Sequence, residues 1–385
     1  MARRHLPTGI TKVEVANPST GAPEDRWRVK LNPTGTDGKR HQVNRSFKTE
    51  REARDFHART LGASAAGTYV HSSKRTVEQA CADWLASKHG LKTTTRRGYK
   101  SSLQPVRDEL GTILIQRLTK RDVDDLVVAL RAGEVDGRRA FTPRTVNQML
   151  GLLSQVLDSE QAQGHVVRNV AKLVDKIPAN PKRYRTLTET EMYAVLDHGC
   201  RKRHLWHLAL FGMRRGEIAG LKWEHVDLKA GTVTIVETRV DGEDGEIVID
   251  TPKSTTSART LPLPVDVIDV LKAARAAQRR ERLKLGNAYQ GGDYVACDES
   301  GREYSPSQIS DGWHRMLKRL SIDEVRLHDA RHTCGTLMHL RGVPIAVISA
   351  WLGHASAAFT MATYAHSQDD ALKAAGQAFE RVEAN

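Results

Sequence analysis

The sequence predicts an α+β protein of several domains, and three observations support this fold class. The chain has 385 residues, enough for two or three domains that each bury a core of their own. Its first part alternates apolar and polar residues around an Asp-Gly turn, whereas residues 73–177 carry only helical patterns, and short alternating segments interrupt the helical patterns further on. We therefore expect a small β-hairpin and helix domain at residues 1–66, an all-α domain at 73–177, and a mainly α domain with a small antiparallel sheet at 183–385.

The first domain is expected to be a hairpin followed by a helix. The segments RWRVKLN and HQVNRSFKT flank PTGTDGKR, whose Asp-Gly favours a tight turn, and a helix follows from Thr49 to Gly62. Residues 1–70 contain 13 Lys and Arg against 7 Asp and Glu, which makes this the most electropositive part of the chain. An ordinary solvated basic face is the alternative to a binding surface. The candidate contacts to a polyanion are Arg28, Lys30, Lys39, Arg40 and Arg45.

Residues 73–177 are expected to form four amphipathic helices after a short linker at 67–73. Thr76 begins a capping box, Thr119 precedes another helical pattern, and Thr142 with Pro143 begins a pattern that Gly164 ends. The remaining helix begins within KTTTRRGYK, where hydroxyl and basic side chains cluster in the first turns. Such side chains and the helix N-terminus can donate hydrogen bonds to phosphate, although each residue alone is an ordinary surface residue. The cluster consists of Thr94, Thr95, Arg96, Arg97 and Lys100.

The third domain follows IPANPKRY, a segment with two prolines that is typical of a linker. Thr188 begins a capping box, and the helical run that follows places Arg214 at a turn between helices. The segments GTVTIVETRV, GEIVIDTPK and ARTLPLP predict the small sheet, with Lys253 at a hairpin tip. Further helices are expected at residues 264–285, 306–320, 328–341 and 367–382.

The stretch from residue 327 to 366 contains the residues most suited to chemistry. In a helix, His328 and Arg331 project from one face, one turn apart, and can bind one anion together. His354 ends a Leu-Gly-His sequence, and Tyr364 follows ten residues later. Each piece alone is weak evidence, because His-x-x-Arg also occurs at residues 165–168 and 198–201 and because such His and Tyr residues are more often core residues.

Arg214, in Arg-Arg-Gly-Glu, and Lys253 precede that stretch and complete an ordered set. The set resembles the tyrosine recombinase (phage integrase) family, whose pattern is Arg, a hairpin Lys, His-x-x-Arg, Leu-Gly-His and a nucleophilic Tyr. The resemblance implies that the first domain is an arm-type DNA-binding domain, as in the larger integrases. It implies that the second is a core-binding (SAM-like) domain and the third the catalytic domain. The implied catalytic residues are Arg214, Lys253, His328, Arg331, His354 and the nucleophile Tyr364.

These side chains match the demands of breaking a phosphodiester without a metal ion. Tyr364 would attack the phosphate and form a 3′-phosphotyrosine, which keeps the bond energy for rejoining. Arg214 and Arg331 would hold the non-bridging oxygens, because a guanidinium stays charged and presents paired donors. His328 and His354 would donate to the phosphate or move the tyrosine proton, and Lys253 is the candidate general acid.

Composition narrows the class of protein further. A net charge of +13 and a pI near 9.6 favour a polyanion such as nucleic acid as the partner. Four widely spaced cysteines suggest neither a disulfide framework nor a zinc site, which fits a reducing cytosol. We expect no metal and no cofactor, and neither a membrane span nor a signal peptide is visible. The protein is therefore expected in the cytoplasm of a bacterial host cell, associated with DNA.

The resemblance implies a site-specific integrase of a phage or other mobile element. Its expected partners are double-stranded attachment sites on DNA, further copies of the chain in a tetramer on that DNA, and accessory proteins that bend DNA or direct excision. The helix at residues 367–382 would pack on its own domain or dock on a neighbouring protomer. Two alternatives stay open: a type IB topoisomerase, which shares this chemistry, and a non-catalytic DNA-binding regulator with the same fold.

Overall fold

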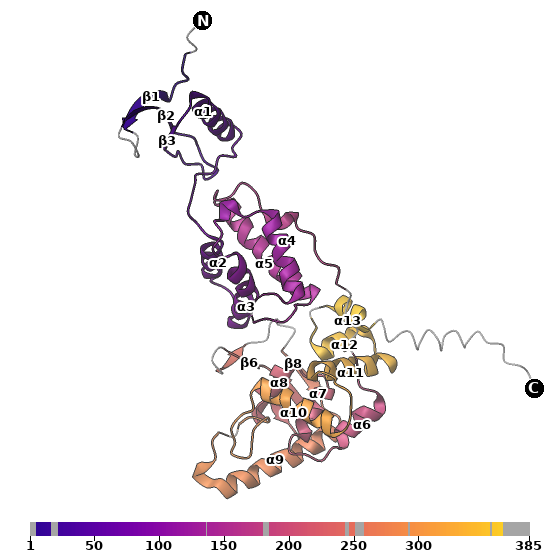
Figure 1. The fold of residues 1–385 in the computed structure, drawn as a ribbon. Coiled ribbons are helices and arrows are strands. Elements are labelled where there is room, and N and C mark those ends of the chain that lie inside the picture. The colour runs from indigo at the N-terminus through magenta and orange to yellow at the C-terminus, as the bar shows by residue number, and fades with distance from the viewer. Residues whose placement is uncertain are drawn as a thin grey trace, which may run out of the picture. The chain divides into compact units, whose positions relative to one another are not determined.

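The structure is a computed structural model that describes residues 5–16, 22–135, 137–179, 185–242, 246–250, 258–291, 293–354 and 356–364, with backbone alone at 250, 359 and 362–364. The chain divides into two compact units, residues 1–181 and 182–385 (Figure 1). Many helices and small antiparallel sheets make up both units, and the expected α+β class is confirmed. The finer division into three domains stays a prediction.

The first unit begins with a three-stranded antiparallel sheet and one helix. The strands are β1 (Ile10–Ala16), β2 (Pro23–Leu31) and β3 (Val43–Phe47), in the order β1-β2-β3. The β2-β3 hairpin was expected, whereas β1 was not. Helix α1 (Glu50–Ala65) begins with a capping box at Thr49 and continues through Gly62, where the expectation ended it. A small core of Ile10, Val29, Leu31 and Ala53 joins sheet and helix.

Four helices follow in the first unit and share a second hydrophobic core (Figure 1). They are α2 (Val77–Ala86), α3 (Thr93–Leu110), α4 (Lys120–Ala132) and α5 (Pro143–Ala162), with the 3₁₀ turns η1 (Ile115–Arg117) and η2 (Val170–Leu173). Side chains of Thr76, Thr119 and Thr142 cap their helices as expected. Helix α3 differs, because its N-cap residue Lys92 makes no side-chain capping bond.

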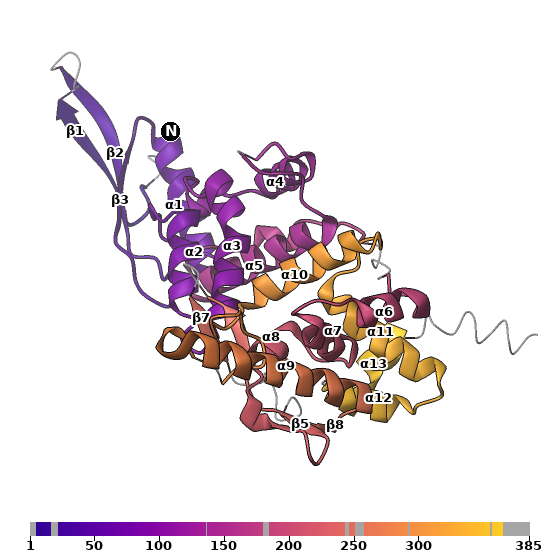
Figure 2. The same ribbon diagram turned by 90° about the horizontal axis from the view of Figure 1, so that it is seen from below.

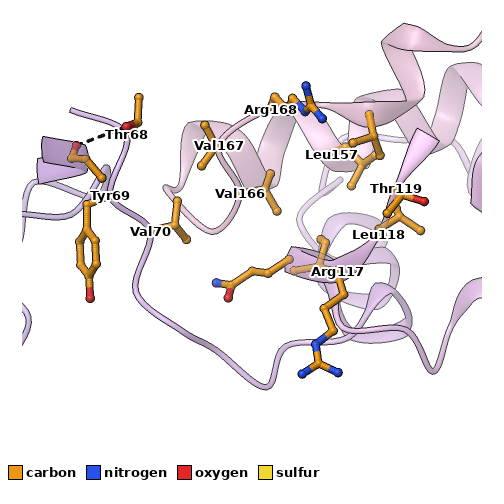
Figure 3. A pocket seen from close by; sticks show the side chains of 14 residues that line it. Thr68, Tyr69, Val70, Arg117, Leu118, Thr119, Leu157, Val166, Val167 and Arg168 are labelled. Atoms are coloured by element: carbon orange, nitrogen blue, oxygen red, sulfur yellow. Dashed lines mark hydrogen bonds between the residues drawn. The ribbon is translucent and has the colours of Figure 1, made fainter. Parts of the chain in front are cut away.

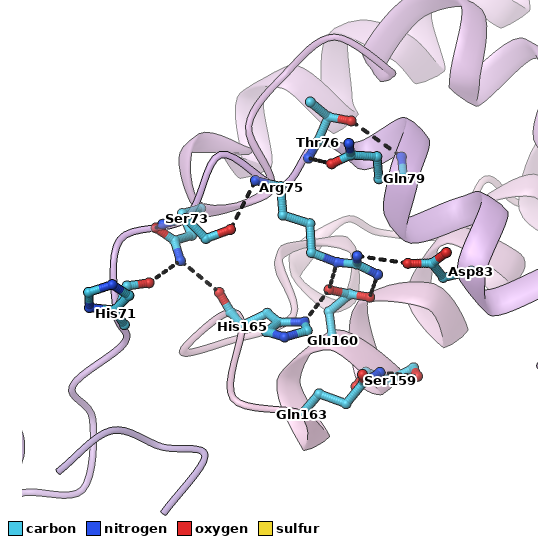
Figure 4. Close-up of polar contacts among 11 residues, drawn as sticks. His71, Ser73, Arg75, Thr76, Gln79, Asp83, Ser159, Glu160, Gln163 and His165 are labelled. Atoms are coloured by element: carbon cyan, nitrogen blue, oxygen red, sulfur yellow. Dashed lines mark hydrogen bonds and ion pairs between the residues drawn. The ribbon is translucent and has the colours of Figure 1, made fainter. Parts of the chain in front are cut away.

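A buried ion pair fixes the start of α2 to the end of α5 (Figure 4). Arg75 Nε and Nη2 donate to the two oxygens of Glu160 at 2.6 and 2.8 Å, and Arg75 also pairs with Asp83. The pKa of Arg75 is raised, chiefly by its hydrogen bonds to Glu160. His165 Nδ1 lies 2.7 Å from Glu160, so one carboxylate joins the segment before α2 to the segment after α5.

The second unit contains helices and two small sheets (Figure 2). Its helices are α6 (Glu189–Asp197), α7 (Arg203–Leu210), α8 (Arg215–Gly220), α9 (Val265–Leu285), α10 (Pro306–Arg319), α11 (Leu327–Leu340), α12 (Ile345–Leu352) and α13 (Ala357–Tyr364), with 3₁₀ turns η3 (Trp223–His225) and η6 (Gly286–Ala288). Its strands are β4 (Val226–Asp227), β5 (Thr232–Ile235), β6 (Thr238–Asp241), β7 (Ile247–Asp250) and β8 (Arg259–Pro262). The core contains Trp206, Trp313 and Leu271.

The single small sheet expected here is in fact two. Among the described strands, β5 pairs with β4 and β8 whereas β6 pairs with β7, so the segment expected as one strand over residues 231–240 is split. Lys253 lies outside the described residues, in the connection between β7 and β8. The expected helix at residues 367–382 also lies outside them.

Candidate active site

Arg214 lies at the turn between α7 and α8. Its backbone N–H donates to Glu217 Oε2 at 2.8 Å, and its Nη1 donates to Glu217 Oε1 at 2.7 Å, so Glu217 caps α8 and holds the guanidinium as well. Gly216 between them has no room for a side chain, because a Cβ there would lie 2.5 Å from Thr238 Cγ2. The Arg-x-Gly-Glu sequence thus lets this turn pack against β6.

Arg331 lies on α11 and is only 2% exposed. Its Nη1 donates to the Gly212 carbonyl at 2.7 Å, and its Nη2 donates to the Leu352 carbonyl. Gly212 needs its glycine, since its φ is +105° and a Cβ would lie 2.8 Å from Leu352 Cδ2. Arg331 therefore joins the turn before Arg214 to the end of α12.

The Leu-Gly-His sequence ends α12, and Arg214 donates a hydrogen bond to its glycine. Gly353 has φ +59°, the left-handed conformation that ends a helix, and its carbonyl accepts a hydrogen bond of 2.6 Å from Arg214 Nη2. His354 follows directly, and its Nδ1 lies 2.8 Å from Thr360 Oγ1 on α13. The structure thus brings Arg214, Arg331 and His354 together.

The remaining predicted catalytic residues are placed less completely. His328 lies one turn before Arg331 on α11, and its ring meets that of His332 edge to face at 5.3 Å. Tyr364 is the last residue of α13, the helix that contacts His354, but its side chain lies outside the described atoms. Lys253 lies outside the described residues altogether.

Arg259 belongs to the same cluster, although no motif in the sequence predicted it. This arginine begins β8, and its Nη1 and Nη2 donate to the two oxygens of Glu217 at 3.1 and 3.0 Å. Its Nε donates to the Trp351 carbonyl at 2.7 Å. Consecutive carbonyls at the end of α12 therefore accept hydrogen bonds from different arginines: Trp351 from Arg259, Leu352 from Arg331 and Gly353 from Arg214.

The electrostatics of the cluster keep the imidazoles neutral and the carboxylate charged. Burial lowers the pKa of His354 to about 3, and the charges of Arg331 and Arg214 add to that effect. Partial burial likewise lowers the pKa of His328, with further contributions from His332 and Arg331, although the residue keeps an exposed edge. For Glu217, burial acts to raise the pKa, but the hydrogen bonds and charges of Arg259 and Arg214 together outweigh it and the pKa is lowered.

This arrangement is suited to binding a phosphate and moving a proton. Guanidinium groups supply fixed positive charge, and neutral imidazoles near them can accept a proton from a phenol or donate an N–H hydrogen bond to an oxygen. Within the part of the chain that the structure describes, no group of three His, Cys, Asp or Glu side chains has a geometry that could hold a metal ion.

The sheet register separates the predicted DNA contacts of the first domain. Arg28 lies opposite Thr11 and Ser46, on the face turned away from buried Val29. Lys30 shares this face, and Lys39 and Arg40 lie exposed in the β2-β3 connection. Arg45 instead lies opposite Val29 on the face toward α1, with its guanidinium 5.3 Å from the Phe56 ring centroid.

The predicted contacts on α3 share its first turns. Arg96, Arg97 and Lys100 are exposed there, whereas Thr94 and Thr95 are half-buried. Lys92, the N-cap residue of α3, provides no side-chain cap, and its carbonyl accepts hydrogen bonds from the Thr95 and Arg96 N–H groups at 2.9 and 3.0 Å.

A cavity of about 520 Å³ in the first unit lies away from all these residues (Figure 3). Tyr69 and Val70 of the linker line one side of it, and Leu157 and Val166 line the other. Arg117 and Arg168 extend from it in opposite directions, so they do not converge on a ligand (Figure 3). We interpret it as a gap beneath the linker.

Residues 182–371 match the model of the phage integrase family. These residues belong to this family, the tyrosine recombinases. It is 28% identical over 245 residues to a XerC-like tyrosine recombinase of Caldanaerobacter subterraneus, spanning 58% of this chain and 62% of that protein. It is 27% identical to an integrase of Streptomyces ambofaciens over 88% of this chain and 89% of the other.

Solved integrase structures share the fold of this tyrosine recombinase. The Tn1549 transposon integrase in complex with transposon right end DNA superposes with a TM-score of 0.64 at 17% identity, covering 79% of this chain and 99% of that one. A lambda integrase tetramer bound to a Holliday junction superposes with a TM-score of 0.53 at 16% identity, covering 92% and 97%. The expectation of a tyrosine recombinase, an enzyme that transfers DNA strands, is confirmed by the family match.

No described helix of the recombinase is long and apolar enough to cross a membrane.

Proposed function

We propose that this recombinase is the integrase of a phage or other mobile element, and that it cuts and rejoins attachment-site DNA through a 3′-phosphotyrosine on Tyr364. The observation that carries the proposal is the convergence of Arg214, Arg331 and His354 on the last turn of α12. The backbone of Tyr364 ends the helix that contacts His354, which supports its role as the nucleophile.

In the first step the phenol oxygen of Tyr364 attacks the scissile phosphorus and displaces the 5′-oxygen of the next nucleotide. Arg214 and Arg331 hold the non-bridging oxygens and stabilise the charge of the pentacoordinate transition state. His354 or His328, neutral in the free protein, accepts the phenol proton or donates to a phosphate oxygen. Lys253 protonates the leaving 5′-oxygen, and the reverse sequence rejoins a DNA strand without ATP.

We further propose two separate DNA-binding surfaces outside the catalytic domain. The outer face of the first sheet, with Arg28 and Lys30, and the nearby Lys39 and Arg40 would bind arm-type sites. The first turns of α3 would bind the core site through Thr94, Thr95, Arg96, Arg97 and Lys100. For Arg45, the contact with Phe56 supports packing more than DNA binding.

The assembly on DNA is proposed to be a homotetramer in the cytoplasm of a bacterial host, with DNA-bending and excision proteins as further partners. The fold shared with the lambda integrase tetramer supports the stoichiometry. Whether the segment at residues 367–382 docks on a neighbouring protomer belongs to the same proposal.

The decisive experiment traps the covalent intermediate. The protein is incubated with nicked duplexes carrying candidate attachment sites, and a covalent protein-DNA band is sought in denaturing gels. We expect a band with the wild type and none with Tyr364→Phe, because only the phenol oxygen is lost, while DNA binding in mobility shifts is unchanged. A protein that binds these sites but forms no adduct would be a regulator, and one that relaxes supercoils as a monomer without joining two DNAs would be a topoisomerase.

A further inference from the structure

Arg259, at the start of the short strand β8, is a buried arginine whose side chain makes hydrogen bonds to two other elements. Its side chain is 7% exposed, and the Glu217 side chain that it contacts is 2% exposed. Both of its Nη atoms bind Glu217 and its Nε binds the Trp351 carbonyl. One side chain thus joins β8, the beginning of α8 and the end of α12.

The charges in this cluster make Arg259 more than a structural link. Glu217 lies 2.7 Å from Arg214, and an isolated pair of this kind would be neutral overall, which weakens the attraction of Arg214 for a phosphate. Arg259 binds both oxygens of the same carboxylate, so the three groups together carry one positive charge. Little water reaches this carboxylate, which makes the balance of charges matter more than it would at the surface.

The bond of Arg259 to the Trp351 carbonyl adds a second effect. This carbonyl lies two residues before Gly353, whose carbonyl Arg214 binds, and three residues before His354. A shift of Arg259 would therefore move the end of α12 relative to Arg214.

We propose that Arg259 is a positioning residue for strand transfer: it balances the charge of Glu217 and binds both of its oxygens, so that the cluster around Arg214 keeps a net positive charge for the scissile phosphate, and it fixes the end of α12 that carries His354. This inference rests on the proposed role of Arg214 at the phosphate.

The test measures single-turnover cleavage of a nicked core-site duplex at saturating protein, together with DNA affinity and thermal unfolding. Arg259→Ala is expected to slow cleavage by about 10²-fold, which is the effect that loss of one charge-stabilising group has in other enzymes. Its affinity for the core site should stay within about twofold of the wild type, because Arg259 is not proposed to touch DNA. Adding Glu217→Gln removes the negative charge that Arg259 balanced, so the double variant should cleave at least about tenfold faster than Arg259→Ala. Arg259→Lys, which keeps the charge but loses the paired donors, should fall between wild type and Arg259→Ala.

Arg201→Ala is the matched control, because Arg201 also pairs with a glutamate, Glu281, and also binds a backbone carbonyl, that of Cys297. It should cleave at the wild-type rate even where its unfolding temperature falls. A folded Arg259→Ala variant with the wild-type rate, or a double variant no faster than Arg259→Ala, would overturn the proposal. If Arg259→Ala does not fold, the comparison of Arg259→Lys with Arg259→Lys plus Glu217→Gln decides in the same way.

Wild type and Arg214→Ala are measured in parallel, so that a failure of the proposed function can be distinguished from a failure of this inference. No adduct from the wild type would refute the proposed function, and an unimpaired Arg214→Ala would refute the role of Arg214. Only when both behave as proposed does an unimpaired Arg259→Ala refute this inference alone.

Discussion

The guanidinium groups of Arg214, Arg259 and Arg331 all bind the carbonyl end of α12, which is the negative end of its helix dipole. A guanidinium has five N–H donors, and the side-chain bonds of Arg214 to Glu217 and Gly353 use two of them. The site is therefore organised before DNA arrives, and a phosphate meets charges that are already fixed in direction.

His204 provides a prediction about stability at the residue scale. Burial lowers its pKa to about 4 from an ordinary value of 6.5, so the folded protein excludes a proton that the unfolded chain binds. Stability is then full above pH 6.5 and is lost as the pH falls toward 4, and this residue contributes a loss of ~2 kcal/mol between pH 7 and 5. Urea unfolding at both pH values should show that His204→Gln, which keeps a donor for the Val295 carbonyl, loses correspondingly less. Equal losses in wild type and variant would contradict it.

Site residues could be predicted from the sequence where a short local motif contains them. His328 and Arg331 share one face of a helix, and Leu-Gly-His marks a helix end, so local spacing was enough to single them out. Arg259 has no such signal, because Glu217 lies 42 residues before it and Trp351 lies 92 after it. Its role depends on contacts between distant elements, which spacing along the chain cannot show.

At the scale of elements, the pair Arg75–Glu160 predicts how α2 and α5 are held together. Replacing Arg75 by Met leaves a carboxylate that is 2% exposed without its bidentate partner, and such a loss costs about 3–5 kcal/mol. Arg75→Met should therefore lower the free energy of unfolding of the first unit by that amount in urea titrations. Removing both charges with Arg75→Met plus Glu160→Leu should cost much less, because no buried charge then lacks a partner.

The control for this prediction is an exposed pair in the same unit. Arg121 and Asp125 lie 3.8 Å apart with side chains 89% and 71% exposed, so Arg121→Met should change the free energy of unfolding by less than about 1 kcal/mol. Equal effects of Arg75→Met and Arg121→Met would show that Glu160 does not need its partner.

Element boundaries were predictable where capping residues mark them. Thr49, Thr76, Thr119 and Thr188 each begin a helix through a capping box formed within four residues. Strand β1 was missed although ITKVEVA alternates, since the connection to β2 contains neither Asn-Gly nor Asp-Gly. The split of residues 231–240 into β5 and β6 was also missed, because each half pairs with a strand that follows later in the chain.

At the scale of the whole molecule, the two proposed DNA-binding surfaces should be separable by mutation, so that each variant loses only one kind of DNA binding. Arg28→Ala with Lys30→Ala changes the outer face of the first sheet, and Arg96→Ala with Lys100→Ala changes the first turns of α3. The first variant should lose affinity for arm-type DNA yet form the covalent adduct on a short core duplex at the wild-type rate. The second should lose core-site affinity, and the slope of log affinity against log salt should fall by about 0.9 for each phosphate contact removed.

Arg45→Met separates a DNA contact from a packing contact in this experiment. Because its guanidinium lies over Phe56 on the face toward α1, the variant should lower stability and leave the salt dependence of arm binding unchanged. A deletion of residues 1–66 that still bound every part of the attachment DNA like the wild type would refute the arm-binding role. If the Arg28 and Lys30 variant lost cleavage of the core duplex, cleavage at the core site would depend on arm binding. That result would refute the independence of the two surfaces.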